Sequence, residues 1–423
     1  MKNGRKKIKQ LIINTFDIKG GAARATYRLH KALQEVGIDS KMLVQYKESD
    51  DYSVIAPVSK SSKTLGKIRS RLDLLPLKKY KNFKKSPWSI SWFPNSISKK
   101  IKLINPDIVH LNWICEGYIP ISEITKINYP IVWTLHDMWA FTGGCHYSYE
   151  CTKYQKKCGS CPQLGSKRNL DISRWIWNRK YKSWRNLNLT IVTPSKWLAK
   201  CAKGSFLFKD LRVEVIPYVI DIDVFKPMGK LIAREILNLP KDKKIIVFGG
   251  ISAASDRRKG FQYLQPALKE LIGSSQKENI ELVIFGLSTP LNPPNLSLKT
   301  NYLGIINDDI TLALIYSAAD VFVAPSIQDN FPNTVLESLA CGTPVVAFDI
   351  GGNPDMIEHK KSGYLVKPLE IVDLAGGVNW IINDENRLNK LSQKARSKVL
   401  NEFVIDKVVT KYIKLFEELI GYK

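Results

Sequence analysis

The sequence predicts an α/β protein made of two doubly wound units, each a parallel sheet covered by helices on both faces. Apolar segments typical of buried strands alternate with amphipathic helical segments along the chain. The 423 residues exceed the length of one ordinary hydrophobic core, and two domains are the simplest arrangement. A proline-marked stretch, Val213 to Pro227, separates two such alternating halves and marks the expected hinge.

The first half opens as a strand, a helix and a second strand. Ile8 to Asn14 is an apolar run, and the helix that follows ends at Gly37. Between them, Gly20 and Gly21 would let a ligand phosphate approach the backbone closely. A tight turn that needs glycine explains the pair equally well. Later strand candidates in this half are PDIVHLNW, PIVWTLHD and LTIVTPS.

The second half carries the most informative pattern of the chain. After the strand DVFVAPS, Asp329 stands in a loop and Glu337 lies eight positions later, about one turn into a helix. Backbone amides at a helix start favour an anion, and carboxylates favour hydroxyl groups. This combination suits a sugar nucleotide. The loop and first helical turn between the two acids hold Phe331, Pro332, Asn333 and Thr334.

A basic turn follows the first strand of this half, KKIIVFGGI. It places Arg257, Arg258 and Lys259 ahead of a helix. Three cations suit a diphosphate, although a basic triplet is more often a solvated turn. The acidic motif nearby favours the diphosphate. The remaining strand candidates are IELVIFG, KTNYLG and TPVVAFD.

His136 ends an apolar strand in the run TLHD. The carboxyl ends of parallel strands are where α/β sheets present groups to ligands, so His136 is a candidate site residue, with a structural role as the alternative. The next residue, Asp137, is expected to help cap the segment that follows.

Four of the seven cysteines fall within 17 residues, and only the last pair has CxxC spacing. Their spacing fits a structural thiolate zinc site, with His146 as a substitute ligand; free thiols or a redox pair are the alternative. The remaining three, Cys115, Cys201 and Cys341, are expected to be ordinary buried residues. The clustered thiols belong to Cys145, Cys151, Cys158 and Cys161.

The net charge of +25 is unevenly distributed: residues 1–226 hold 41 Lys/Arg against 17 Asp/Glu, and the remainder is nearly neutral. Residues 60–102 contain 13 basic residues with tryptophans among them, which predicts a surface segment. Contact with anionic lipid ranks first, a solvated face second and nucleic acid third. No apolar run reaches the roughly 20 residues that cross a bilayer, and the N-terminus lacks a signal-peptide pattern. We therefore expect a cytoplasmic protein.

Several motifs in order resemble the retaining glycosyltransferases of family 4, which have the two-Rossmann GT-B fold. They are the first glycine turn, TLHD, TPSKWL, RRKGF, DNFPNTVLESLACGTPVVAFDIGGNPDMI and SGYLVKP. FDIKGGAARATYRLHKAL and TLHDMWAFTGGCHYSYEC are most similar to bacterial exopolysaccharide enzymes of the colanic-acid type. The resemblance implies two Rossmann-like domains across a cleft: residues 1–220 facing acceptor and membrane, and 221–404 binding the donor. Residues 405–423 would form a helix able to cross back to the first domain.

The resemblance also assigns roles. Glu337 would hold the nucleotide ribose, and Asp329 the hydroxyls of the transferred sugar, where glutamate is the commoner residue in the family. Lys259 with Arg257 or Arg258 would neutralise the diphosphate, which Gly20 and Gly21 would cover from the other domain. His136 would lie beside the sugar, so that His136, Asp329 and Lys259 form the catalytic group. The backbone of Phe331, Pro332, Asn333 and Thr334 would face the sugar and phosphates.

The function implied is transfer of a hexose-type unit from a nucleoside diphosphate sugar to an acceptor hydroxyl, with retention. The acceptor would be a saccharide or a polyprenyl-diphosphate-linked sugar at the inner face of the plasma membrane. No cofactor beyond the structural zinc is expected, since Asp221 and Asp223, which have the spacing of a metal-binding pair, fall in the linker. The alternatives are a nucleic-acid-binding α/β protein or another GT-B enzyme such as a sugar-nucleotide epimerase.

Overall fold

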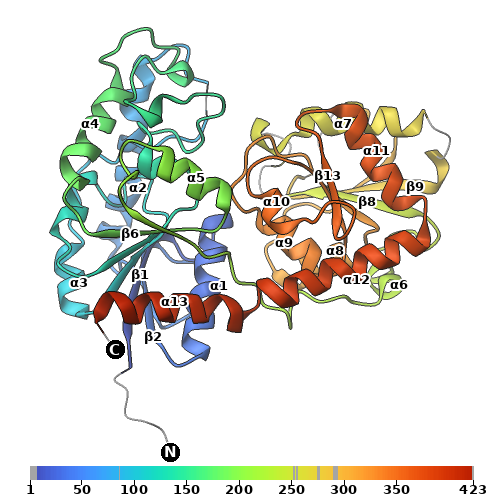
Figure 1. Cartoon of the computed structure of the whole chain (residues 1–423), viewed down its shortest axis with the longest axis horizontal. Coiled ribbons are helices and arrows are strands. Elements are labelled where there is room, and N and C mark those ends of the chain that lie inside the picture. Colours follow the sequence, from blue (N-terminus) through green and yellow to red (C-terminus); the bar gives the residue numbers. More distant parts are fainter. Residues whose placement is uncertain are drawn as a thin grey trace, which may run out of the picture. The chain divides into compact units, whose positions relative to one another are not determined.

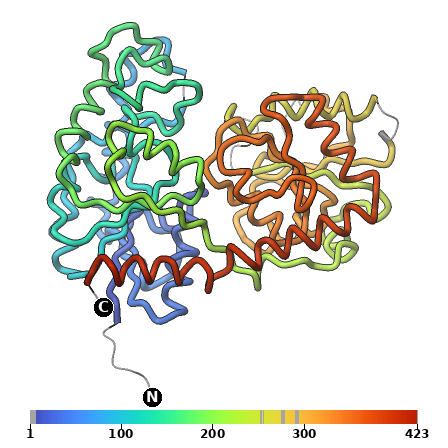
Figure 2. Tube along the Cα trace, viewed as in Figure 1, coloured from blue at the N-terminus to red at the C-terminus, as the bar shows by residue number. Residues whose placement is uncertain are grey.

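The computed structural model describes residues 7–84, 86–250, 253, 256–273, 277–288 and 294–421. The chain divides into two compact units (Figures 1 and 2): unit 1 is Met1–Pro217 with Val409–Lys423, and unit 2 is Tyr218–Val408. The first boundary lies three residues before the predicted one, because Tyr218 and Ile220 already contact unit 2. The Tyr218 ring packs on Phe331 at 5.4 Å, and the Ile220 N–H donates to the Phe403 carbonyl.

Unit 1 is built on a seven-stranded parallel sheet in the order β3-β2-β1-β4-β5-β6-β7. The apolar run of β1 explains its central place, since its side chains are buried on both faces of the sheet. The connections leave β1 and β4 in opposite directions, so their carboxyl ends form a switch point, where such sheets bind ligands. The strands are β1 (Lys9–Phe16), β2 (Asp39–Tyr46), β3 (Val54–Ile55), β4 (Ile108–Leu111), β5 (Ile131–Thr134), β6 (Leu189–Thr193) and β7 (Arg212–Val215).

Three helices of unit 1 begin after a short polar side chain that caps them, whereas α1 and α3 begin after Gly20 and Ile97 without a side-chain cap. Ser59, Asp171 and Ser195 each accept a hydrogen bond from a backbone N–H in the first turn of the helix that follows. The α-helices are α1 (Gly21–Glu35), α2 (Lys60–Leu74), α3 (Ser98–Ile104), α4 (Ile172–Trp184) and α5 (Lys196–Gly204). Short 3-10 turns are η1 (Leu75–Lys79), η2 (Ile121–Lys126), η3 (Trp139–Phe141), η4 (Lys153–Gln155) and η5 (Pro162–Leu164).

The basic segment 60–102 does not display its aromatic residues as predicted. Trp88 is buried, and the rings of Phe83 and Trp92 pack against the core of unit 1. The Trp92 indole donates to the carbonyl of Leu72. Charge and aromatic content in one stretch of sequence therefore separate in space, with the lysines outside and these rings inside.

Unit 2 has a six-stranded parallel sheet in the order β10-β9-β8-β11-β12-β13, with its switch point between β8 and β11. Its strands are β8 (Lys244–Gly249), β9 (Ile280–Phe285), β10 (Lys299–Tyr302), β11 (Val321–Ala324), β12 (Val345–Phe348) and β13 (Gly363–Val366). Its helices are α6 (Lys230–Ile236), α7 (Phe261–Ile272), α8 (Asp309–Ala318), α9 (Asn333–Ala340), α10 (Asn353–Met356), α11 (Ile371–Ile382) and α12 (Glu385–Glu402), with 3-10 turns η6 (Arg257–Lys259) and η7 (Lys277–Asn279).

The last helix, α13 (Ile405–Ile420), packs mostly on unit 1 (Figure 1). Tyr412 and Phe416 are buried there against the ring of His110, and the Tyr412 hydroxyl lies 3.1 Å from the Thr134 hydroxyl. The carboxylate of Glu418 pairs with Arg212 at 2.8 Å. Among the residues that the structure describes, no helix is both long and apolar enough to cross a membrane.

Candidate functional site

Two loops meet at the switch point of unit 2, one after β8 and one after β11. The N–H of Ile327 donates to the carbonyl of Arg258 at 2.8 Å, which ties the basic turn to the loop that leads to Asp329. Gly260 makes this approach possible: its φ is 78°, and a Cβ there would stand 1.7 Å from the Pro325 carbonyl oxygen. Only glycine fits, so the basic turn is held in place by backbone geometry.

This arrangement brings Asp329 against two of the three predicted cations. Its Oδ2 accepts hydrogen bonds from Arg258 Nη1 and Lys259 Nζ, both at 2.8 Å. Arg258 also pairs with Asp256, which the sequence analysis did not select, at 3.0 Å. Arg257 is exposed, and of the two arginines it is Arg258 that pairs with Asp329. Which of the two contacts the diphosphate stays open.

The electrostatics of this cluster keep Asp329 ionised. Burial alone would raise its pKa, but the charges and hydrogen bonds of Lys259 and Arg258 outweigh burial and hold the pKa well below its usual range. The side chain of Asp329 is only 11% exposed, so solvent screens these interactions weakly. The result is a fixed carboxylate with two cations at one sheet edge.

A third loop, between β12 and α10, fixes the backbone of Asp329. The N–H of Gly352 donates to the Asp329 carbonyl at 3.1 Å. Gly351 has φ 64°, and a Cβ there would lie 2.1 Å from that same oxygen. The glycines of the segment DIGGNP therefore serve to pack a loop tightly against Asp329.

Glu337 lies on α9 and is 2% exposed. The hydroxyl of Tyr316, on α8, donates to its Oε2 at 3.1 Å. Tyr316 was not predicted, because nothing in the local sequence links α8 to the acidic motif. Asn333 and Thr334 begin α9 as expected, whereas Pro332, predicted in the first helical turn, occupies the N-cap position just before it. The Phe331 side chain packs into the core of unit 2.

In unit 1, His136 lies at the switch point beyond β5 and is buried. Its Nε2 is 3.0 Å from Asn112 Oδ1 and 3.3 Å from the Thr26 hydroxyl. Burial lowers the pKa of His136 to about 4, against the opposing effect of Asp137, so the imidazole is neutral at pH 7. Gly20 precedes α1 with φ 94°, and no atom lies within 4 Å of where its Cβ would be, whereas Gly21 is the first residue of α1.

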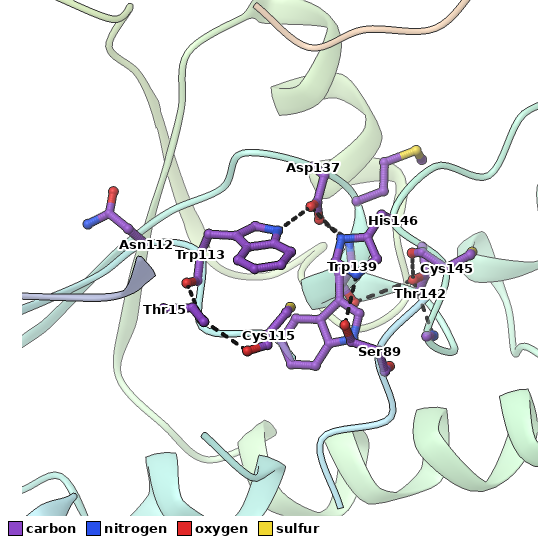
Figure 3. Close-up of polar contacts among 12 residues, drawn as sticks. Thr15, Ser89, Asn112, Trp113, Cys115, Asp137, Trp139, Thr142, Cys145 and His146 are labelled. Carbon is purple, nitrogen blue, oxygen red and sulfur yellow. Dashed lines mark hydrogen bonds and ion pairs between the residues drawn. The ribbon is translucent and has the colours of Figure 1, made fainter. Parts of the chain in front are cut away.

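Asp137 organises the loop that follows β5 (Figure 3). Its Oδ1 accepts from the Trp139 N–H, which confirms the predicted cap. Its Oδ2 accepts from the Trp113 indole at 2.9 Å and lies 2.6 Å from His146 Nδ1. The other ring nitrogen of His146 is 3.0 Å from the Ser89 hydroxyl. With both nitrogens engaged, His146 is not available as the substitute metal ligand.

A row of aromatic rings crosses the carboxyl edge of the sheet in unit 1. Tyr46 stacks on Phe16 with centroids 5.0 Å apart, Phe16 on Trp113 at 6.3 Å, and Trp113 lies 5.5 Å from the ring of His146. Tyr46, Phe16 and Trp113 are half-buried. Tyr46 and Phe16 are the last residues of β2 and β1, and Trp113 follows the end of β4. Trp113 also lines a small cavity with His136 and Asp137. The sequence analysis did not select Tyr46, Phe16 or Trp113, since each lies at or just after the end of a different strand.

The four clustered cysteines line one cavity of unit 1. Among the described residues, no three His, Cys, Asp or Glu side chains are arranged as metal ligands, so the predicted zinc site stays a prediction. All are thiols rather than disulfides. Of the three remaining cysteines, Cys115 and Cys341 are buried as expected, whereas Cys201 is only half-buried.

Two family descriptions match this chain in succession. Residues 19–224 match "Glycosyltransferase Family 4", and residues 230–398 match "Glycosyl transferases group 1". The chain belongs to glycosyltransferase family 4. It is an enzyme, a glycosyltransferase of the hexosyltransferase type, and its two parallel α/β sheets are those of the GT-B fold. This membership disfavours the alternative of a nucleic-acid-binding module.

Relatives of this family 4 enzyme come from bacteria and archaea. An uncharacterized glycosyltransferase of Methanocaldococcus jannaschii is 26% identical over 64% of this chain and 70% of its own length. The "UDP-Gal:alpha-D-GlcNAc-diphosphoundecaprenol alpha-1,3-galactosyltransferase" of Escherichia coli is 28% identical over 50% and 56% respectively. Other curated relatives are matched over 36% to 65% of their length. The solved sucrose-phosphate synthase of Thermosynechococcus elongatus has a TM-score of 0.70 at 20% identity, over 99% of this chain and all of that one.

The ion pairs of Asp329 predict a pH-dependent loss of stability in Asp329→Asn. Removing one partner of a buried pair should cost about 3 kcal/mol of unfolding free energy at pH 7. Because the folded-state pKa is depressed, this stabilisation is present above the unfolded pKa of about 4 and is lost as pH falls toward the folded value. Urea unfolding at several pH values should show the difference from wild type shrinking below about pH 4. The exposed Asp242→Asn is the control; an equal difference at low and neutral pH would contradict the assignment.

Proposed function

We propose that the enzyme transfers a sugar from a nucleoside diphosphate sugar to an acceptor hydroxyl, with retention at the anomeric carbon. The observation that carries the proposal is the cluster at the switch point of unit 2, where Asp329 is held between Arg258 and Lys259. Ligands of open α/β sheets bind at this edge. A donor of this class carries both kinds of group that the cluster can bind, anionic phosphates and neutral hydroxyls.

In this proposal, Arg258 and Lys259 contact the diphosphate, and the start of α9 presents its backbone amides. Asp329 accepts hydrogen bonds from the sugar hydroxyls, and Glu337 binds the ribose. Arg258 and Lys259 have a second effect. They keep the Asp329 carboxylate ionised, so it can accept hydrogen bonds from sugar hydroxyls but cannot donate them. The name of the Escherichia coli relative, which specifies a UDP-sugar donor, supports the donor class.

The chemistry places most of the barrier in the departure of the diphosphate. The bond between the anomeric carbon and the diphosphate oxygen breaks, and fixed cations stabilise the charge that develops on the leaving group. The acceptor oxygen forms the new bond on the same face of the sugar, and its proton passes to the leaving phosphate. Buried, neutral His136 would orient sugar hydroxyls rather than take up that proton. That Gly20 and Gly21 cover the diphosphate stays a prediction.

We assign the acceptor to the aromatic row of unit 1 formed by Tyr46, Phe16 and Trp113. The carbon-bound hydrogens of one pyranose face form an apolar surface that packs on an aromatic ring. The three rings lie at a sheet edge and are half-buried, and Asp137 fixes the Trp113 indole. A saccharide acceptor would therefore stack on Trp113.

A lipid carrier for that saccharide is supported by the surface of α2. Leu65 and Ile68 are exposed by 40% and 43%. They adjoin a stripe of exposed cations that recurs at Lys63, Lys67 and Arg71. Apolar and basic stripes side by side are what binds the surface of an anionic membrane. We propose that α2, rather than the tryptophan-bearing part of the segment, contacts the inner leaflet near a polyprenyl-diphosphate-linked acceptor.

Donor binding can be tested with nucleoside diphosphate sugars of different bases in a thermal-shift assay. At least one should raise the melting temperature of the wild type, and Glu337→Gln should weaken its binding about tenfold, because a charged hydrogen bond to the ribose becomes a neutral one. The Tyr316 contact survives this substitution, since the glutamine oxygen still accepts. The control is Glu270→Gln, on the exposed face of α7. The donor assignment fails if no donor stabilises the wild type or if the Glu337 variant binds as tightly.

The acceptor assignment predicts a selective effect of Trp113→Ala on transfer to undecaprenyl-diphosphate-linked N-acetylglucosamine. Loss of one stacking surface should raise the KM for this acceptor about tenfold and leave the donor KM nearly unchanged. Trp113→Phe should restore most of the affinity, and Trp175→Ala, at an exposed tryptophan of α4, should have no effect. An increase in the donor KM instead would place Trp113 on the donor.

Membrane contact through α2 predicts binding to vesicles that contain phosphatidylglycerol but not to purely zwitterionic vesicles. Replacing Leu65 and Ile68 together by serine should reduce co-sedimentation at least tenfold, since each apolar side chain contributes about 1.5 kcal/mol or more when buried in lipid. The matched control replaces Leu231 and Ile232, which are exposed on α6, by serine. Binding that does not depend on anionic lipid, or an equal loss in the control, would refute the assignment to α2.

A further inference from the structure

The loop between β5 and α4 is long and almost devoid of regular structure. From Leu135 to Asp171 it forms only the 3-10 turns η3, η4 and η5. Loops of this length without helix or strand are uncommon in compact domains, and those that keep one conformation need a device that holds them. The loop nevertheless carries Asp137 and His146, whose contacts fix Trp113. Met138, Trp139 and Phe141 near its start and Leu164 near its end pack into the core of unit 1. The residues between them, 145–161, contribute Tyr154 and three of the clustered cysteines to that core.

The four clustered cysteines are the only closely spaced thiols of the chain, and all of them face one cavity of about 340 Å³, part of which is open to solvent. They converge from the two ends of the irregular stretch, Cys145 near its start and Cys161 beside η5. Gly143 packs so closely that a Cβ on it would lie 2.8 Å from the Cβ of Cys158. The loop thus folds back on itself around sulfur atoms.

A buried cation stands beside this cavity. Lys180, on α4, is fully buried, and its ammonium donates to the carbonyls of Trp139 and Thr142 while lying 3.8 Å above the Trp139 ring. In the part of the chain that the structure describes, it forms no ion pair with a carboxylate, although the charge of Asp137 still acts on it. A buried charge without a counter-charge is costly. Thr142, which Lys180 contacts, lines the cysteine cavity.

We infer that Cys145, Cys151, Cys158 and Cys161 bind one structural zinc ion. Thiolate sulfur is the preferred ligand of zinc in tetrahedral sites that stabilise loops with little apolar core. Four thiolates around one zinc carry two net negative charges, which would add a counter-charge near Lys180 to the charge of Asp137. The lysines of the loop, Lys153, Lys156 and Lys157, add further positive charge around the site.

The four thiols line one cavity, but their sulfur atoms are not arranged around a single point as the ligands of a bound metal ion would be. Among the described residues, no three histidine, cysteine or carboxylate side chains are set around a common point as metal ligands. Changes of rotamer at the cysteines move the sulfur atoms by a few ångströms without moving the backbone. Zinc binding would release the thiol protons as the four sulfurs turn inward. The role is structural, because the protein supplies all four ligands and leaves no open position.

Metal analysis of the full-length chain, purified under reducing conditions without chelator, tests this inference. We expect about one zinc ion per chain by mass spectrometry. Cys158→Ser and Cys161→Ser should lose most of it, whereas Cys115→Ser, Cys201→Ser and Cys341→Ser should keep it. These three cysteines do not line the cavity and are matched controls for the same substitution.

A second measurement covers variants that fail to fold. Titrating the wild type with a mercurial reagent, with a chromogenic chelator present, should release zinc in step with the modification of four thiols. The cobalt-substituted chain should show the strong visible bands of tetrahedral thiolate coordination. The inference is overturned if the reduced wild type neither contains nor takes up zinc, or if the clustered cysteines are paired as disulfides. It is also overturned if the control variants lose as much zinc as the cluster variants.

Discussion

The position of Asp329 between two cations depends on a constraint of parallel sheets. Where β8 and β11 lie side by side, their connections leave in opposite directions, and the loops that follow the two strands meet at the carboxyl ends. The polar groups of the two loops must then find partners in each other. The hydrogen bond from the Ile327 N–H to the Arg258 carbonyl holds the two loops together, and the carboxylate of Asp329 pairs with both Arg258 and Lys259. A buried ion pair is poor evidence for stability by itself. Its value here is that it fixes three side chains that a phosphorylated sugar can bind.

Unit 1 meets the same constraint with neutral groups. At its switch point the hydrogen bonds join His136, Asn112 and Thr26, and burial keeps the imidazole uncharged. Aromatic rings occupy the strand ends, and Asp137 is hydrogen-bonded to Trp113 and His146. A second carboxylate of this edge, the buried Asp17, accepts hydrogen bonds from the backbone of Glu48 and Ser49. The two units share a topology but differ in the chemistry of the same edge.

Most of the fold could be predicted because the sequence pattern has one physical origin. Strands in the middle of each sheet are buried on both faces and are mostly apolar, so they are visible in the sequence, and glycines mark the turns at Gly20, Gly260 and Gly351. The edge strands are less distinct: β7 and β10 are partly exposed and mixed in composition, and β3 and β13 were not predicted. What escaped prediction depends on residues far apart in the chain. Nothing near Tyr316 indicates that it contacts Glu337, and the rings of Phe16, Tyr46 and Trp113 form a row only when three strands pair. The prediction for residues 60–102 was wrong for the same reason. Composition shows that the segment contains tryptophan, but it does not show whether the tryptophan side chains are buried.

The uneven charge of the chain follows from this separation of burial and composition. The excess of cations in the first half does not lie at the ligand edge of unit 1, where His136 is neutral and the strand ends are aromatic. Instead, cations stand on the exposed face of α2 and in the loop of clustered cysteines, and one, Lys180, is buried among carbonyls and rings with the thiols of Cys145 and Cys158 nearby. Burial lowers the pKa of Lys180 to about 7, although ionised Cys115, Cys145 and Cys158 would each raise it. Burial also raises the pKa of the Cys145 and Cys158 thiols, so burial disfavours charge on the lysine and on the sulfur atoms alike. Charge on either group would favour charge on the other, which couples the buried cation to the group of thiols.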